Sequence, residues 1–343
     1  MKKLVSISMG LLLLLFLAAC GSNSTSIEAT DKDQTSEKGK ELKEVSIMLD
    51  WYPNAVHSYL YVAQEKGYFE EEGLKVDIQF PANTTDPLTL AAAGKVTLGL
   101  YYQPDVIMAK VNENVPVKSV AAIVQSPTNY TVFPADSSIQ SPKDLEGKKV
   151  GYPGIPLNEA LLETIVSHDG GDIKKVEMID VGFELNSSLV TENVDAVIGA
   201  YINHEVPVLE HNGFDTRYFN LVDYGVPSYN EIVLITSEDT WEKEKESIQA
   251  FWRAAEKGFQ FMKENPDEAL EVLLNNQDQA NFPLVEEVEK ESLEVLLPKM
   301  EEGGVQFGTQ NEETWTEVAN WLKETGLIKE VPNVSDLIVN IEE

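Results

Sequence analysis

Residues 46–78 constrain the fold of this chain more than any other stretch, because they combine a strand, a loop, a helix and a second strand. The apolar run of residues 45–49 leads into a polar loop, residues 50–57. The helical segment that follows ends at Gly67, and residues 76–80 then alternate between apolar and polar side chains. A strand, a helix and a strand in this order form the unit from which parallel sheets are built. The sequence therefore predicts an α/β fold.

The loop of residues 50–57 is the first candidate for ligand binding. In parallel sheets, ligands bind beyond the carboxyl ends of the strands and beside helix N-termini, and this loop occupies such a place. It has more aromatic and hydrogen-bonding groups than a turn requires, namely Asp50, Trp51, Tyr52, Asn54 and His57.

The N-terminus has the pattern of a secretory signal. Lys2 and Lys3 precede an apolar run, residues 4–18, which is short for a membrane span and is followed by Ala19 and Cys20. These residues resemble the lipobox of bacterial lipoproteins, in which the cysteine becomes the lipidated first residue of the mature chain. We therefore expect a signal peptide over residues 1–19 and a lipid on Cys20. A buried cysteine behind an N-terminal core helix is the alternative.

Cys20 is the only cysteine in the sequence, so a lipid there leaves no disulfide and no thiolate metal site. Residues 20–40 are mostly polar and too poor in apolar groups to fold, which is typical of a flexible tether. Together these features predict a protein held by lipid at the extracellular face of the cell membrane.

The charge of the chain is strongly acidic. It contains 58 Asp and Glu residues against 26 Lys and Arg residues, a formal net charge of −32. Such a surface repels polyanions, so we expect no nucleic-acid partner. Residues 41–343 are enough for one large or two medium domains, and we expect the protein to act as a monomer.

Two segments far apart in the chain resemble each other. Residues 95–101 and 193–201 both run from a polar residue through an apolar strand to a tyrosine. This echo suggests two similar α/β lobes, and a later strand, residues 230–236, could return to the first of them.

We expect a first lobe built from residues 41–129 and 227–343, and a second lobe built from residues 130–226. The chain then crosses between the lobes twice, near residues 129–133 and 224–232. Two lobes with two crossings can close over a ligand by hinge motion.

Four segments together resemble the substrate-binding proteins of ABC importers that carry pyrimidine precursors of thiamine. These segments read LDWYPNAVHSYLYVAQEKGYFEEEGLKVDI, GKVTLGL, SPKDLEGKKVGYPG and VDAVIGAYINHE. The likeness extends over nearly all of the expected globule, from about residue 45 to residue 322. The wider group also contains binding proteins for sulfonates and nitrate, and a fungal pyrimidine synthase. Trp51 and the segment of residues 201–205 favour the pyrimidine branch.

The resemblance implies a type II periplasmic-binding-protein fold, in which two α/β lobes are joined by a two-strand hinge with a ligand cleft between them. It also implies an ABC permease and its ATPase as partners. The synthase branch uses its own histidine, pyridoxal phosphate and a cysteine-rich iron motif. Here Cys20 is the only cysteine and no lysine stands in the expected cleft loops. We therefore expect a binding protein without a cofactor, and no enzyme.

A pyrimidine with an exocyclic amine needs flat faces to stack on and hydrogen-bonding groups in the plane of its ring. Trp51 from the first lobe and Tyr201 from the second are our candidates for the two faces. Glu205 is the candidate acceptor for the exocyclic amine, as a carboxylate is for the amine of cytosine. Each also fits a structural role: Trp51 in the core, Tyr201 at a sheet rim and Glu205 at the exposed start of a helix.

Four further residues are candidates for contacts with polar atoms of the ligand: Asn54, His57, Asn203 and Tyr101. Asn54 also suits a helix cap, and His57 a structural role. Weaker candidates lie at other strand ends or lobe edges, namely Asn129, Tyr130, Asn158 and Glu184. No spacing of histidines and acids predicts a metal site.

The sequence thus predicts a receptor that captures an aminopyrimidine such as N-formyl-4-amino-5-aminomethyl-2-methylpyrimidine for thiamine salvage. Two alternatives stay open. One is the same transport role with hydroxymethylpyrimidine, thiamine, a sulfonate or nitrate as ligand, although the expected cleft loops contain no arginine to bind an anion. The other is an exported enzyme that processes such a pyrimidine.

Overall fold

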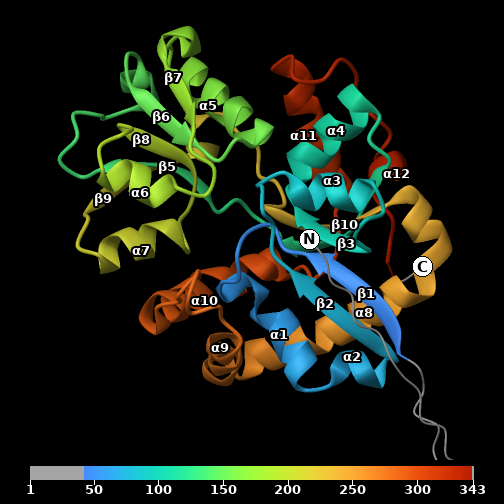
Figure 1. Cartoon of the computed structure of the whole chain (residues 1–343). Helices are drawn as coiled ribbons and strands as arrows, with labels where there is room; N and C mark the ends of the chain where they lie inside the picture. The colour runs from blue at the N-terminus through green and yellow to red at the C-terminus, as the bar shows by residue number, and fades with distance from the viewer. Residues whose placement is uncertain (1–41, 342–343) are drawn as a thin grey trace, which may run out of the picture. The chain divides into compact units, whose positions relative to one another are not determined.

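A computed structural model describes residues 42–341 of the protein, and its ten strands form two mixed sheets (Figure 1). The strands are β1 (Lys43–Met48), β2 (Leu74–Gln79), β3 (Leu98–Tyr101), β4 (Val117–Val124), β5 (Asn129–Pro134), β6 (Lys149–Tyr152), β7 (Glu177–Asp180), β8 (Ala196–Tyr201), β9 (Thr216–Asn220) and β10 (Ile232–Ser237). Sheet A has the order β2-β1-β3-β10-β4, and sheet B has the order β7-β6-β8-β5-β9.

The two sheets share one topology. In sheet A the strands β2, β1 and β3 are parallel, and β10 runs antiparallel to both β3 and β4. In sheet B the strands β7, β6 and β8 are parallel, and β5 runs antiparallel to both β8 and β9. The antiparallel strand of each sheet directly follows a crossing from the other one, residues 125–128 before β5 and residues 225–231 before β10. The prediction of two α/β lobes is confirmed. The first crossing lies just before the predicted residues 129–133, which form part of β5.

The echo between two segments of the sequence has a structural counterpart. Strand β3 ends at Tyr101 and β8 ends at Tyr201, and each occupies the central position of its sheet, beside the antiparallel strand. The same succession of polar residue, strand and tyrosine therefore marks the same place in both sheets.

Helices cover the faces of both sheets. The α-helices are α1 (Ser58–Glu65), α2 (Tyr68–Glu71), α3 (Asp86–Ala92), α4 (Gln103–Glu113), α5 (Pro156–His168), α6 (Leu185–Val190), α7 (Glu205–His211), α8 (Glu238–Glu264), α9 (Pro266–Asn275), α10 (Glu286–Met300), α11 (Glu312–Glu324) and α12 (Val334–Leu337). Five 3₁₀ helices join them: η1 (Ala55–His57), η2 (Pro142–Leu145), η3 (Ile173–Lys175), η4 (Leu221–Tyr224) and η5 (Glu302–Gly304).

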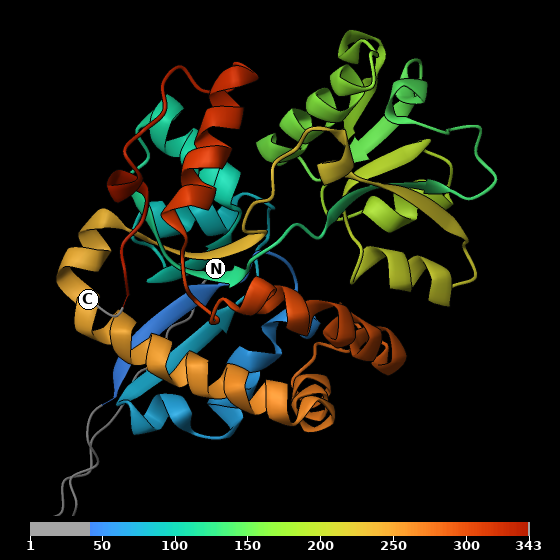
Figure 2. The same cartoon turned by 180° about the vertical axis from the view of Figure 1, so that it is seen from behind.

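The helices divide between the sheets. Helices α5, α6 and α7 contact sheet B, and we refer to this assembly as the B lobe. The remaining α-helices pack on sheet A or on one another and form the A lobe with it, and Figure 2 shows the long helix α8 running beside α9 and α1. Helix α8 approaches α1 closely at Gly258, where a Cβ atom would stand 2.1 Å from the Tyr59 carbonyl oxygen, so a larger residue would force these helices apart.

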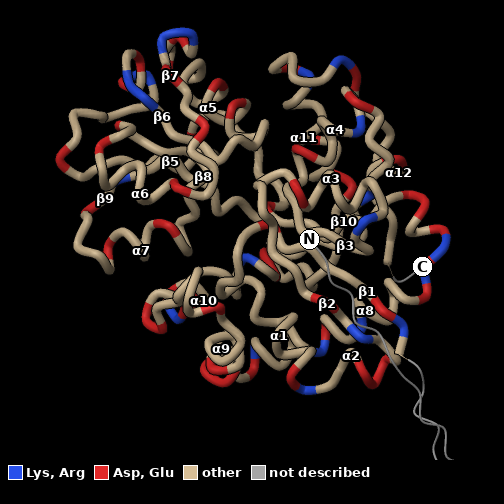
Figure 3. Tube along the Cα trace, in the orientation of Figure 1, with Lys and Arg blue, Asp and Glu red and all other residues tan. Residues whose placement is uncertain are grey.

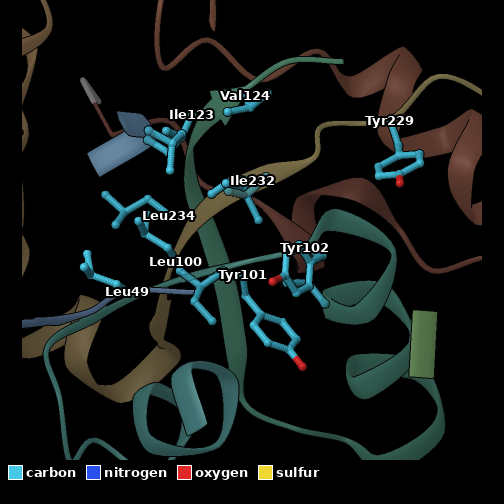
Figure 4. Close-up of a cluster of buried hydrophobic side chains, with 14 of the residues drawn as sticks. Leu49, Leu100, Tyr101, Tyr102, Ile123, Val124, Tyr229, Ile232 and Leu234 are labelled. Atoms are coloured by element: carbon cyan, nitrogen blue, oxygen red, sulfur yellow. The ribbon is translucent and has the colours of Figure 1, made fainter. Parts of the chain in front are cut away.

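The core of the A lobe lies around the central strands of sheet A. Strands β4 and β10 are nearly continuous runs of buried residues, as expected of strands covered on both faces. Figure 4 shows Leu100 of β3, Ile123 of β4 and Leu234 of β10 in one buried cluster with Tyr101 and Tyr102, whose ring centroids are 4.8 Å apart. This packing fixes the carboxyl end of β3, next to the site described below.

The predicted signal peptide, Cys20 and the tether of residues 20–40 lie outside the described residues. Among residues 42–341, none of the helices combines the length and the apolar character that crossing a membrane requires.

Candidate functional site

A cavity lies where the carboxyl-end loops of both sheets meet, and we refer to it as the central cavity. Both lobes contribute to its walls, together with the crossing residue Thr128. Its lining residues are Asp50, Trp51, Asn54, Val56, Tyr102, Thr128, Asn129, Pro153, Ile155, Leu157, Asn158, Gly199, Tyr201, Asn203, His204, Glu205, Ile232 and Leu296.

Trp51 lines the cavity from the A lobe, yet its side chain packs with the apolar cluster of the B lobe. Its ring lies 4.5 Å from that of Phe183, edge to face, and it belongs to the same buried cluster as Leu185 and Val197. The indole Nε1 is buried near the Tyr52 hydroxyl but makes no hydrogen bond of good geometry with a described residue. The Trp51 ring is therefore positioned by contacts with the B lobe, and its indole N–H group has no hydrogen-bond partner among the described residues.

Tyr201 lines the cavity from the end of β8, and a buried carboxylate fixes its hydroxyl. The Tyr201 Oη atom donates to Glu231 Oε1 at 3.1 Å. Burial, and after it the Glu231 carboxylate, raise the pKa of Tyr201 well above its usual value, so the hydroxyl keeps its proton. The ring is thus anchored at its polar end.

Glu231 also ties the two crossings together. It is completely buried, and its Oε2 atom accepts hydrogen bonds from the backbone N–H groups of Thr128 at 2.6 Å and Asn129 at 2.9 Å. Tyr229 donates to the same oxygen at 3.3 Å. One carboxylate on the second crossing therefore orients the first crossing and the Tyr201 side chain together.

Glu205 lines the cavity at the start of α7 and is almost fully buried. Its Oε2 atom accepts from the Tyr201 backbone N–H at 2.8 Å, and its Oε1 atom lies 2.8 Å from His204 Nδ1. Because a carboxylate can accept about four hydrogen bonds, Glu205 can still bind a ligand amine.

His204 stands between carboxylates of both lobes. Its Nε2 atom lies 4.0 Å from Glu289 Oε1 of α10, on the side away from Glu205. Burial alone would lower the pKa of His204, but Glu205, then Glu289 and Asp50, raise it to about 9. His204 is therefore an imidazolium at neutral pH, and it is the only basic residue among those that line the cavity.

His57, a predicted ligand contact, is not among the residues that line the cavity. The ring is fully buried, with Nε2 2.9 Å from Asp50 Oδ1, while Nδ1 accepts from the Asn54 backbone N–H at 3.2 Å. Both ring nitrogens of His57 therefore have partners within the A lobe.

Asn54 lines the cavity, but its side-chain oxygen caps η1 by accepting a hydrogen bond from the Val56 backbone N–H. This cap is the structural role that the sequence offered as the alternative for Asn54.

Tyr101 is also absent from the cavity wall, where its neighbour Tyr102 stands instead. Side chains alternate along a strand, so a shift by one residue moves a side chain to the opposite face.

Asn203 does line the cavity. Its Nδ2 atom donates to Ser292 Oγ of α10 at 3.1 Å, while its buried Oδ1 atom has no partner among the described residues.

Among the weaker candidates, Asn129 and Asn158 line the cavity, whereas Tyr130 and Glu184 do not. Asn129 Nδ2 donates to Asn158 Oδ1 at 2.9 Å, and Asn129 Oδ1 accepts from the Gly199 backbone N–H at 3.0 Å. Gly199 has φ of +96°, and a Cβ there would stand 2.8 Å from Pro153 Cδ, so this position requires glycine.

The main lining residues that the sequence did not single out as contacts are Asp50, Tyr102, Thr128, Pro153 and Ile155. Asp50 stands in the loop that the sequence marked, and Tyr102 and Pro153 directly follow strands. Their positions just beyond strand ends could have marked them as candidates in the sequence. Thr128 lies in the crossing between the lobes, and no local sequence pattern marks it as a cavity residue.

The electrostatics of the cavity differ from those of an anion site. The lining includes the carboxylates of Asp50 and Glu205 but no lysine or arginine. Figure 3 shows acidic residues concentrated on α9 and α10, and basic residues gathered at the turns beside β6 and β7. The arrangement can hold a flat ring against aromatic faces and accept hydrogen bonds from amines. Among residues 42–341, no group of three His, Cys, Asp or Glu side chains is arranged to hold a metal ion.

Known structures resemble the described residues over most of their length. The alkanesulfonate-binding protein SsuA from Xanthomonas axonopodis pv. citri, bound to MOPS, matches with a TM-score of 0.69 and 13% identity, over 88% of this chain and 99% of that one. A Candida albicans protein described as having the generic periplasmic binding protein fold matches with a TM-score of 0.65 and 17% identity, over 87% and 96% of the two chains. At these identities the likeness shows the fold, and the predicted periplasmic-binding-protein fold is confirmed.

Sequence relatives extend this result. The chain is 55% identical, over 322 residues and 94% of each chain, to the formylaminopyrimidine-binding protein of Halalkalibacterium halodurans. The family described as NMT1/THI5 like matches residues 54–269, which is more than half of the chain. The protein with this two-lobed cavity therefore belongs to the NMT1/THI5-like family.

Proposed function

We propose that this protein captures an aminopyrimidine precursor of thiamine, such as N-formyl-4-amino-5-aminomethyl-2-methylpyrimidine, and delivers it to an ABC importer. The observation that carries the proposal is the central cavity, where aromatic rings and carboxylates meet without lysine or arginine. The 55% identity to a formylaminopyrimidine-binding protein supports this class of ligand.

In the proposed complex, the pyrimidine ring lies between the indole of Trp51 and the phenol of Tyr201, which line the cavity from different lobes. Stacking of a base on an aromatic side chain contributes about 1–3 kcal/mol. The exocyclic amine donates to Glu205, and the amide oxygen of Asn203, which has no protein partner among the described residues, accepts from a donor of the ligand. These hydrogen bonds discriminate against rings that lack the amine.

The absence of lysine and arginine from the cavity lining disfavours a sulfonate or nitrate. A processing enzyme would need a nucleophile with a base beside it, or a metal centre. Among the described lining residues, Thr128 supplies the aliphatic hydroxyl, and the histidine in the cavity is held between two carboxylates and not beside that hydroxyl. We therefore propose binding and release without chemical change of the ligand.

The membrane anchor belongs to the same proposal. A lipid on Cys20, after removal of residues 1–19, holds the protein at the extracellular face of the membrane, where a permease with its ATPase receives the ligand. These residues lie outside the described part of the chain, so mass spectrometry of the membrane-extracted protein is the direct test. A chain that still begins with residues 1–19 contradicts the anchor.

Calorimetry tests the choice of ligand. We expect the formylated aminopyrimidine and hydroxymethylpyrimidine to bind more tightly than thiamine, and taurine and nitrate to give no heat. A des-amino analogue should bind at least about tenfold more weakly, because it leaves a buried acceptor unpaired. Tighter binding of taurine than of any pyrimidine overturns the proposal, and conversion of the pyrimidine during a long incubation points to an enzyme instead.

The variant Glu205→Gln tests the proposed acceptor. It keeps the size of the side chain but weakens the acceptor, so we expect affinity to fall by about 1–3 kcal/mol. The matched control is Glu210→Gln, which removes the same charge from the exposed part of the same helix. Equal affinity of both variants and the wild type removes Glu205 from the ligand contacts.

A further inference from the structure

Asp50 is a buried carboxylate in the central cavity that the proposed contacts above do not use. Its side chain lies in the loop between β1 and η1, and only 2% of the residue is exposed. The Oδ1 atom lies 2.9 Å from His57 Nε2, which leaves Oδ2 available to a ligand in the cavity.

The histidine beside Asp50 does not neutralise its charge. The backbone N–H of Asn54 donates to His57 Nδ1 at 3.2 Å, so this nitrogen carries a lone pair and not a proton. The proton of the ring is then on Nε2, where it is donated to Asp50. In this arrangement His57 gives the Asp50 carboxylate one hydrogen bond and no second N–H donor, and the Asp50 side chain is almost fully buried.

The other basic side chain near Asp50 is His204, which already interacts with two other carboxylates. His204 lies 2.8 Å from Glu205 and 4.0 Å from Glu289, so one imidazolium faces two carboxylates before Asp50 is considered. The other titratable groups that Asp50 influences are phenols that keep their protons, since burial is the first cause that raises the pKa of each: Tyr59, Tyr102 and Tyr201. The described walls of the cavity thus carry more negative than positive charge.

A buried carboxylate without a cationic partner is costly, and a ligand that brings a positive charge removes that cost. An aminopyrimidine can do so, because its ring nitrogen is a weak base whose protonated form spreads the charge onto the exocyclic amine. We propose that Asp50 selects the protonated pyrimidinium form of the ligand, so that the ring takes up one proton from solvent as it binds. No covalent bond other than this N–H bond changes. This inference rests on the proposed function and specifies the charge state of its ligand.

Calorimetry in buffers of different ionisation enthalpy measures the proton directly. Formylaminopyrimidine is titrated at a pH one to two units above the pKa of the free ring, in phosphate and in Tris at the same pH. We expect uptake of close to one proton per ligand, and affinity that falls about tenfold per pH unit in this range. Ligand binding with no proton uptake overturns the inference but leaves the proposed function intact, whereas no binding of any aminopyrimidine overturns the proposed function itself.

The ultraviolet spectrum of the bound ligand locates the proton. We expect the difference spectrum of the complex to match that of the pyrimidinium ion, measured with free ligand in acid. A neutral-ring spectrum together with proton uptake means that a protein group, such as Glu289, takes the proton, and this outcome also overturns the inference.

The variant Asp50→Asn assigns the effect to one side chain. Its amide oxygen can still accept from His57 Nε2, so the buried contact is kept while the charge is removed. We expect proton uptake to fall to near zero and affinity to fall at least tenfold. The matched control, Asp77→Asn on the exposed side of β2, should retain both values. Unchanged uptake in a folded Asp50→Asn protein excludes Asp50 as the selecting group.

Discussion

At the residue scale, the cavity combines groups that are already committed with groups that are free for a ligand. The Tyr201 hydroxyl is bound to Glu231, and Glu231 in turn holds the backbone of Thr128 and Asn129. The Tyr201 hydroxyl therefore has a structural role, and only the ring is available to contact a ligand. Trp51 is the converse case, because its ring packs against Phe183 in an edge-to-face contact while its N–H group has no good partner among the described residues.

This division predicts different results for two changes at Tyr201. Tyr201→Phe keeps the ring and removes the donor to Glu231, so we expect nearly unchanged ligand affinity and a loss of about 1 kcal/mol in unfolding free energy. Tyr201→Ala removes the ring, so we expect affinity to fall by about 1–3 kcal/mol. Calorimetry and urea unfolding of both variants provide the comparison. A larger affinity loss in Tyr201→Phe than in Tyr201→Ala is incompatible with stacking by this ring.

At the element scale, the loop between β1 and α1 belongs to the A lobe but also contacts the B lobe. Asn54 caps η1, and Glu289 of α10 accepts from the Ala55 backbone N–H at 2.7 Å, so two elements fix the start of this short helix. Trp51, earlier in the same loop, reaches the other lobe and packs against Phe183 in the turn after β7. Ring orientation at the cavity therefore depends on an element of the opposite sheet.

The variant Phe183→Ala tests this dependence. Removing the ring should leave Trp51 less ordered, so we expect ligand affinity to fall by about 0.5–1.5 kcal/mol, the value of an aromatic pair. The fluorescence of the free protein should also change as one indole becomes more exposed. Phe80→Ala is the control, since Phe80 is 42% exposed and contacts Phe282 and not Trp51. If the two variants bind the ligand equally well, Phe183 does not orient Trp51 for binding.

The same elements show what the sequence could predict. The two α/β units and their crossings were predictable because apolar strands, helix ends and the echo between residues 95–101 and 193–201 are local patterns. The position of Tyr102 in place of Tyr101 was not, because it depends on which face a strand end turns to the cavity. Glu289 and Glu231 come from distant parts of the chain, and nothing near them in sequence marks a buried carboxylate. The structural role of His57 could not be predicted, because its partners, Asp50 and the Asn54 backbone, appear only in the folded loop.

At the scale of the whole molecule, four polar contacts between described residues of the A lobe and the B lobe stand out around the cavity. Thr84 Oγ1 donates to the Pro153 carbonyl at 2.7 Å, and Asp105 Oδ1 accepts from the Leu157 backbone N–H at 3.1 Å. The other two are the contacts of Asn203 with Ser292 and of His204 with Glu289. Asp105 is the most costly of these groups, because its other oxygen, Oδ2, is buried without a partner among the described residues.

The ionisation of Asp105 should make the folded state sensitive to alkaline pH. Burial is the main cause that raises the pKa of Asp105 from 3.8 to about 8, against the lowering effect of the Leu157 N–H group. The folded protein therefore keeps a proton that the unfolded chain releases above about pH 4, and this contribution to stability is lost as the pH rises toward 8. His204 acts in the same direction at higher pH, because its folded pKa of about 9 lies above the unfolded value of 6.5.

The variant Asp105→Asn separates these two contributions. Its side chain resembles the protonated acid and can still accept from the Leu157 N–H, so its stability should lack the Asp105 dependence and keep that of His204. We expect similar unfolding free energies for variant and wild type near pH 4, and an advantage of about 1–3 kcal/mol for the variant at pH 9. Glu113→Gln, which removes an exposed carboxylate from the same helix, should follow the wild type. Parallel curves for Asp105→Asn and the wild type from pH 4 to 9 would mean that this carboxyl is ionised in the folded protein throughout, and that the contact between α4 and α5 carries a full charge.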